Sequence, residues 1–98
     1  MPAIIGACRL TLRLPESQSL KDKRQVIRSL QARLRNTYNV SVAETGDQDK
    51  WQVTEILVTL AASDSRHAEE VLSKVVAFTE GYHFPVELLE AYTELIDL

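Results

Sequence analysis

Apolar and polar residues alternate at the start of the chain, from Ile4 to Leu14. A period of two over this length predicts a β-strand with one buried face, and Pro15 ends it. The side predicted to be buried comprises Ile4, Gly6, Cys8, Leu10, Leu12 and Leu14. The opposite side comprises Ile5, Ala7, Arg9, Thr11 and Arg13.

A different period follows between Ser19 and Tyr38. The apolar residues Leu20, Ile27, Leu30 and Leu34 recur at spacings of seven, three and four, which places them on one face of a helix. Ser19 precedes this run and Asp22 lies three residues later, the spacing of a capping box. The segment is therefore predicted to be one amphipathic helix that begins after Ser19.

The second half of the chain repeats the two patterns. Residues 40–45 and 51–62 read as two strands joined by a turn at 46–50, and Ser63-Asp64-Ser65 offers N-caps for a second helix. That helix is expected to reach about Glu80, with Gly81 as the residue after its end. The tail from Val86 fits a helix as well as a strand. We interpret it as a strand, because the first strand otherwise keeps an unpaired edge.

The resulting order, β-α-β-β-α-β, predicts an α+β fold of the ferredoxin-like type, with a four-stranded antiparallel sheet and two helices on one face. Residues 1–98 are expected to form one such domain. The first and third strands are expected to be central and parallel. The open sheet face, which includes Leu57 and Thr59, is either solvated or one half of a sheet-to-sheet homodimer.

Composition narrows the class of protein. A hydrophobic fraction of 45% and a charged fraction of 26% are typical of an ordinary globular protein, and no apolar run approaches the roughly 20 residues that cross a bilayer. The N-terminus shows no secretion signal, and one cysteine fits a reducing compartment. We therefore expect a cytoplasmic protein without a membrane partner, in which Cys8 is a small core residue.

Charge divides unevenly along the chain, although the formal net charge is only −3. Residues 1–38 hold eight of the eleven Lys and Arg residues, and residues 39–98 hold twelve of the fourteen acidic ones. Four of the cations share one face of the first predicted helix, and we call them the basic stripe: Lys21, Arg24, Arg28 and Arg35. The stripe is either a solvated helix face or a strip that binds anions, such as a nucleic-acid backbone or an acidic partner. Lys23 lies near the apolar face, and we expect its stem to stretch outward to solvent.

Known catalytic patterns are absent from the sequence. There is no glycine-rich phosphate loop and no CxxC, and His67 and His83 have neither Cys nor a second His nearby. Glu44, Asp47 and Asp49 around the turn are more typical of local capping than of a magnesium site. We expect no enzymatic activity, no cofactor and no metal. Trp51 is interpreted as core packing beside the hairpin, with a recognition role as the alternative.

Three segments together resemble the YlxP-like family of small bacterial proteins of unknown function: SLKDKR (19–24), NVSVAE (39–44) and GDQDKWQ (46–52). The resemblance continues through GACRLTLRLPESQSLKDKR (6–24) and covers nearly the whole chain. It implies a ferredoxin-like fold, a bacterial cytosolic origin and no established activity. Family genes often lie near those of transcription-termination, translation-initiation and ribosome-maturation factors, which implies an RNA or ribosome context.

Two functions remain open from the sequence. The first is a non-enzymatic accessory protein that contacts RNA or a ribonucleoprotein through the basic stripe. The alternative is a homo-oligomeric protein-interaction module that uses the open sheet face. Base stacking on the central strands, as in RNA-recognition modules, is set aside because their open face carries no Phe or Tyr.

Overall fold

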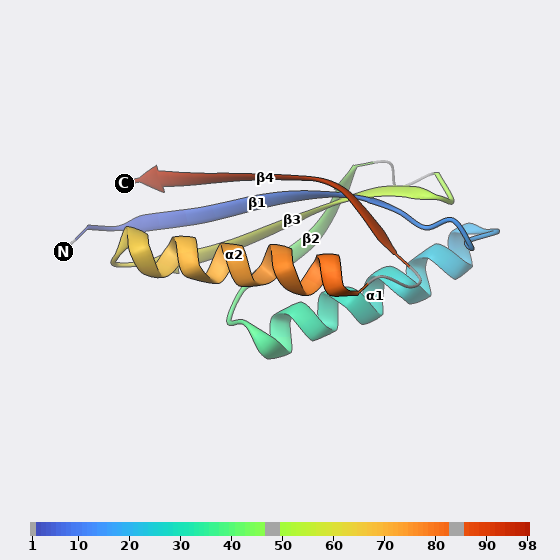
Figure 1. The fold of residues 1–98 in the computed structure, drawn as a ribbon, viewed down its shortest axis with the longest axis horizontal. Helices are drawn as coiled ribbons and strands as arrows, with labels where there is room; N and C mark the ends of the chain where they lie inside the picture. The colour runs from blue at the N-terminus through green and yellow to red at the C-terminus, as the bar shows by residue number, and fades with distance from the viewer. Residues whose placement is uncertain (1, 47–49, 83–85) are drawn as a thin grey trace.

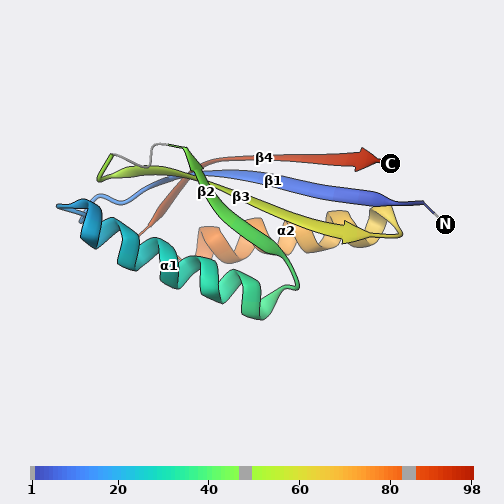
Figure 2. The same ribbon diagram turned by 180° about the vertical axis from the view of Figure 1, so that it is seen from behind.

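The computed structural model describes residues 2–46, 50–82 and 86–98, which form one four-stranded sheet with two helices against it (Figures 1 and 2). The molecule is elongated, with extents of 48 × 23 × 21 Å. In chain order the elements are β1 (Ile4–Arg13), α1 (Leu20–Thr37), β2 (Ser41–Gly46), β3 (Val53–Ala62), α2 (Ser65–Gly81) and β4 (Glu87–Asp97). This is the predicted ferredoxin-like order, and the tail is a strand as expected.

The strands lie in the order β2-β3-β1-β4, and every neighbouring pair is antiparallel. β1 and β3 are central, but the expectation that they run parallel is wrong. Each helix returns the chain to a strand parallel to the one before it, and another strand separates the two. The β2–β3 hairpin then reverses direction, so β3 runs opposite to β1.

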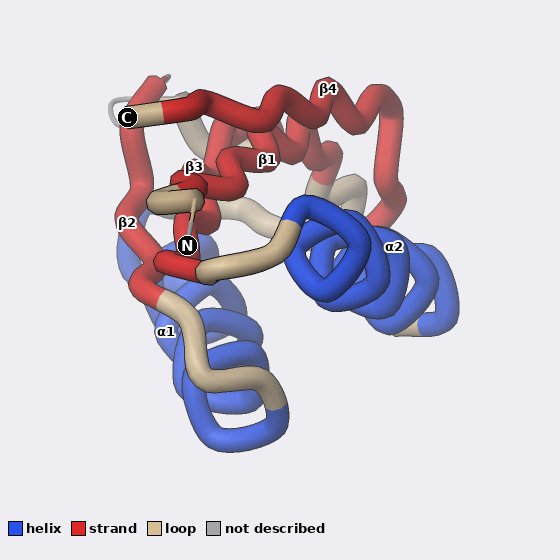
Figure 3. Tube along the Cα trace, turned by 90° about the vertical axis from the view of Figure 1, so that its left-hand side faces the viewer, coloured by secondary structure: helices blue, strands red, loops and turns tan. Residues whose placement is uncertain are grey.

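Both helices lie on the same face of the sheet, and they diverge from each other when the molecule is viewed along its length (Figure 3). α1 packs closest to β2, whereas α2 packs on β1 and β4. The edge of the sheet at β2 and the edge at β4 therefore have different helices below them.

One core joins the helices to the alternating side of β1. Ile27, Leu30 and Leu34 of α1 are buried with the apolar residues of β1 and β3, and these include Cys8, Leu10, Leu12, Ile56 and Val58. Gly6 allows α2 to approach β1, because a Cβ at Gly6 would lie 3.0 Å from Leu60 Cδ2 and 3.4 Å from Leu72 Cδ1. The period of two in β1 is thus explained by a face that two helices cover.

The helix ends follow their side-chain chemistry. Ser19 Oγ accepts a hydrogen bond from the Asp22 backbone N–H at 3.1 Å, and Asp22 Oδ2 accepts one from the Gln18 N–H at 3.1 Å. Asp64 caps α2 in the same way through the Arg66 N–H. Gly81 is the last residue of α2 and Tyr82 is its cap. The helix therefore ends one residue later than predicted. In the described residues, no helix is long and apolar enough to cross a membrane.

Candidate anion-binding surface on the first helix

The basic stripe lies on the solvent side of α1. All four of its side chains, those of Lys21, Arg24, Arg28 and Arg35, are exposed. From Lys21 to Arg35 the helix rises about 21 Å, at 1.5 Å per residue. The stripe faces outward because Ile27, Leu30 and Leu34, on another side of the same helix, are held in the core.

No carboxylate in the described part of the chain neutralises the stripe. The ion pairs found there instead join Arg9 to Glu55, Arg13 to Glu87 and Lys23 to Glu44. Arg33, on a different side of α1, lies over the Tyr82 ring at 5.6 Å from its centroid. The cations of the stripe are therefore available to an external anion.

Lys23 is buried, with a relative exposure of 1%, so the expectation that its stem escapes to solvent is wrong. Its Nζ lies 3.1 Å from Glu44 Oε2 and donates to the Lys50 carbonyl oxygen at 2.7 Å. Thr54 Oγ1 also donates to Glu44 Oε2. A paired carboxylate and a carbonyl explain why this charge tolerates burial, and together they fasten the first turn of α1 to the β2–β3 hairpin.

A shallow hollow of about 320 Å³ lies beside the middle of the stripe, between α1 and β2. Arg24, Ile27, Arg28 and Gln31 line it from the helix, and Val42, Ala43 and Glu44 line it from the strand. The Glu44 carboxylate is the one that pairs with Lys23. The pattern of the helix alone could not place β2 at this position, because the neighbour depends on the crossover. Next to the two arginines, the hollow thus holds a polar amide, small apolar side chains and one carboxylate that is already bound to Lys23 and Thr54.

The other candidates from the sequence fall elsewhere. Trp51 is 54% exposed, so the interpretation as core packing is wrong. His67 is exposed, while His83, Asp47 and Asp49 lie outside the described residues. Across the ranges that are described, no three His, Cys, Asp or Glu side chains gather as metal ligands would.

Cys8 is fully buried, as predicted for a core residue. Burial raises the pKa of its thiol from 9.0 to about 11, because the buried thiolate would lose its hydration. A thiol in this environment stays protonated at neutral pH and is a poor nucleophile.

Comparison with known proteins places the chain among relatives whose names state no activity. Residues 5–93 match a family described as a protein of unknown function, DUF503. YlxP of Bacillus subtilis (strain 168), an uncharacterized protein, is 33% identical over 79 residues, which cover 81% of this chain and 86% of YlxP. A de novo designed protein, Foldit4, has a similar fold, with a TM-score of 0.55 and 14% identity over 96% of each chain.

Proposed function

We propose a function on the premise that this chain belongs to the DUF503 family of proteins of unknown function. This membership, together with the similarity to YlxP, confirms the resemblance to YlxP-like proteins seen in the sequence. In this proposal the chain is a non-enzymatic accessory protein that binds RNA, alone or in a ribonucleoprotein. The contact is made by the basic stripe on α1. The observation that carries the proposal is that all four stripe cations are exposed and, within the described residues, have no carboxylate partner.

The acidic net charge does not oppose this assignment, because the charges are separated in space. α1 lies below the β2 side of the sheet, whereas the strand that holds Glu87, Glu90, Glu94 and Asp97 forms the opposite edge. A positive strip on an acidic protein still raises the local concentration of an anionic partner. The distance between the two regions also limits how far the carboxylates repel a bound backbone, since screening acts over about 10 Å at 0.1 M salt.

Contact with phosphates rather than with base edges fits the side chains that are present. Arginine and lysine on an exposed helix face position a nucleic-acid backbone without reading its sequence. The open faces of β1 and β3 carry no aromatic side chain on which a base would stack. We therefore propose shape-dependent binding with little base specificity.

The test compares two double variants with the same change in net charge. Arg24→Glu/Arg28→Glu reverses the middle of the stripe, and Arg66→Glu/Lys74→Glu reverses two exposed cations on α2. Binding to a structured RNA is measured by fluorescence anisotropy at fixed salt. We expect the first variant to lose at least about tenfold in affinity and the second to stay within about threefold. Equal losses in both variants, or none in the first, would contradict the proposal.

A second candidate is a homo-oligomer that buries the open sheet face. The observation in its favour is that Tyr92 and Ile96 are exposed on this face, in register with Arg9 and Ile5 of β1. Light scattering at micromolar concentration tests it. We expect a dimer that dissociates in the Leu57→Glu variant, because the new carboxylate would be buried between two sheets. A monomer in both proteins would rule this candidate out.

A further inference from the structure

β4 differs from the other strands because one of its edges is unpaired and its side chains are mostly exposed on both faces, although Leu88 and Leu95 pack against the core. It is the last strand of the sheet and pairs only with β1 in the described structure. On its helix side Ala91 and Thr93 are exposed, and on its other side Tyr92 and Glu94 are exposed. By contrast, exposure along β2, the other edge strand, alternates residue by residue.

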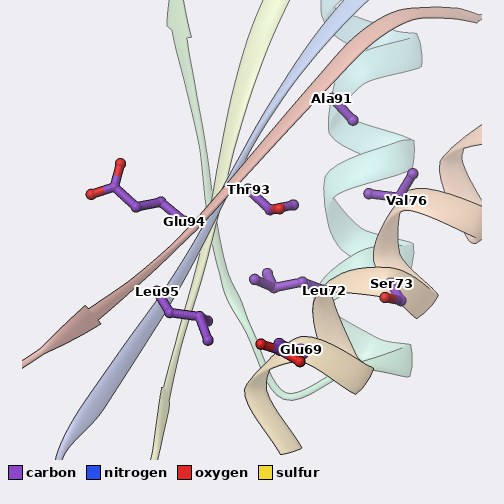
Figure 4. Close-up of a pocket in the computed structure, with 8 residues that line it drawn as sticks. All are labelled: Glu69, Leu72, Ser73, Val76, Ala91, Thr93, Glu94 and Leu95. Atoms are coloured by element: carbon purple, nitrogen blue, oxygen red, sulfur yellow. The ribbon is translucent and has the colours of Figure 1, made fainter. Parts of the chain in front are cut away.

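A trough of about 680 Å³ runs between this strand and α2. Leu72 and Val76 form its apolar side, and Ala91, Thr93 and Leu95 point into it from β4 (Figure 4). Glu69 and Ser73 of α2 also line it, whereas Glu94 points away toward the open sheet face (Figure 4). The trough exists because Ala91 and Thr93 are too small to fill the space over α2.

The outer edge of β4 is regular and unprotected over its second half. The register against β1 shifts at Leu89, and residues 90–97 then continue without a bulge. Eight residues of antiparallel strand extend about 27 Å. Neither a lysine nor a proline, the usual protection against an added strand, occurs in β4.

We propose that the edge of β4 and the trough below it accept an extended peptide of a partner protein, in which lysine or arginine alternates with small apolar residues. This is strand addition, in which the main chain pairs with the edge and alternate side chains enter pockets. The small side chains occupy the trough beside Leu72 and Val76. The cationic ones lie on the open sheet face, beside Glu90 and Glu94.

Charge selects this guest over a second copy of the chain. On the open sheet face, two β4 strands placed side by side would bring together Glu90 and Glu94 of both copies, whereas Glu87 on this face is already paired with Arg13. Like charges across a strand pair destabilise it. A basic strand instead places cations beside Glu90 and Glu94. The surface lies away from the basic stripe, so this inference does not depend on the proposed function.

The test uses an eight-residue peptide with lysine at four alternate positions and valine or threonine between them, and a matched peptide with glutamate in place of lysine. Affinity is measured by calorimetry, and the site is located by amide hydrogen exchange. We expect the lysine peptide to bind at least about tenfold more tightly and to slow exchange in residues 89–96, not in β2. Equal affinities, no binding, or protection elsewhere would overturn the proposal.

Backbone methylation separates strand addition from a purely electrostatic contact. Only every second amide of an added strand faces the edge. Methylating one alternate set of peptide amides should abolish binding, and methylating the other set should change it less than about threefold. The same loss from both sets would overturn the proposal.

Protein variants complete the experiment. Thr93→Phe fills the trough with a residue that strands accept, and Glu94→Lys reverses the facing charge, so each should weaken binding at least about tenfold. Glu70→Lys, an exposed change of equal charge outside the trough, is the control for Glu94→Lys, and Arg24→Glu/Arg28→Glu should bind the peptide normally.

A dimer with protected β4 amides in the absence of peptide would show that a second copy of the chain occupies the edge. That result would overturn the proposal of a basic peptide.

Discussion

Lys23 shows how a single side chain departs from what its position in the sequence indicates. A lysine one turn into a helix normally reaches solvent, and the periodicity places it only near the apolar face. Its partners, Glu44 and the Lys50 carbonyl, come from a hairpin more than 20 residues away in the chain. Local pattern predicts the helix but cannot identify this pair.

Removing the Lys23 amine should destabilise the protein. In Lys23→Met, the Glu44 carboxylate, whose side chain is only 20% exposed, loses its ion pair with Lys23. Breaking a buried pair from one side costs about 3–5 kcal/mol, and we expect about 2–4 kcal/mol here because Glu44 keeps some solvent and the Thr54 hydrogen bond. Urea unfolding measures the change.

Two further variants test this explanation. Lys21→Met, at an exposed position on the same helix, should change the free energy of unfolding by less than about 0.5 kcal/mol. Lys23→Met/Glu44→Gln should recover part of the loss, because the carboxylate that paired with the Lys23 amine is then removed as well. A double variant no more stable than Lys23→Met would contradict the assigned cause.

Cys8 should be inert in the folded protein. Its thiol is fully buried, with a pKa raised to about 11, so both access and ionisation are low. We expect iodoacetamide at pH 8 to label the native protein at least about a hundredfold more slowly than the protein in urea, as followed by mass spectrometry. Rapid labelling without urea would mean that β1 opens locally.

The raised pKa of Cys8 also determines the direction in which the free energy of unfolding changes with pH. The folded thiol holds its proton to a higher pH than the unfolded thiol, whose pKa is near 9.0. The contribution of Cys8 to stability is therefore complete below pH 9 and is lost as the pH rises toward 11. A Cys8→Ala variant should show a smaller decline than the parent protein between pH 9 and 11.

At the scale of elements, α1 depends on its cap. Ser19 Oγ is the acceptor for the Asp22 N–H, so Ser19→Ala leaves that N–H without its partner. We expect a loss of about 1 kcal/mol, seen as a decrease of roughly 4–8 °C in Tm by circular dichroism. Ser19→Asp keeps an acceptor and should stay close to the parent protein. Equal losses in both variants would indicate that packing, not the cap, limits this end of α1.

The periodic elements were the predictable part of the fold. β1, both helices and the β2–β3 hairpin follow from alternation, helical spacing and turn residues. β4 is predicted only by a topological argument, because Leu88, Leu95 and Ile96 fit a helix as well as a strand. The expectation that β1 and β3 run parallel is wrong, and the predicted order itself contains the answer: the first crossover makes β2 parallel to β1, and the β2–β3 hairpin then makes β3 antiparallel to β1.

The candidate site was only partly accessible from the sequence. The four stripe cations share a face because helical spacing determines it. The hollow beside Arg24 and the trough below β4 depend on which strand each helix covers, and that arises only in the folded chain. Core packing of Trp51 is a wrong prediction: an aromatic residue normally favours the interior, but this one is 54% exposed.

At the scale of the whole molecule, the separation of charge should appear in the salt dependence of binding. Four phosphate contacts predict a slope of log affinity against log salt of about −3 to −4, from about 0.7–0.9 per contact. Arg24→Glu/Arg28→Glu should reduce the magnitude of this slope to about 2 or below, because two contacts remain. Anisotropy titrations between about 50 and 200 mM salt measure the slope of the parent protein and of the variant. A flat slope in the parent protein would exclude binding through the stripe.

The exposed position of Trp51 gives the molecule a built-in optical reporter. It is the only tryptophan in the chain. It follows Lys50, whose carbonyl oxygen accepts a hydrogen bond from the Lys23 amine in the first turn of α1. Its indole already meets water in the native state, so emission there should be red-shifted and quenched readily by iodide. A macromolecule that binds over the start of α1 would shield the indole from water. Its binding could then be followed by intrinsic fluorescence without attaching a dye.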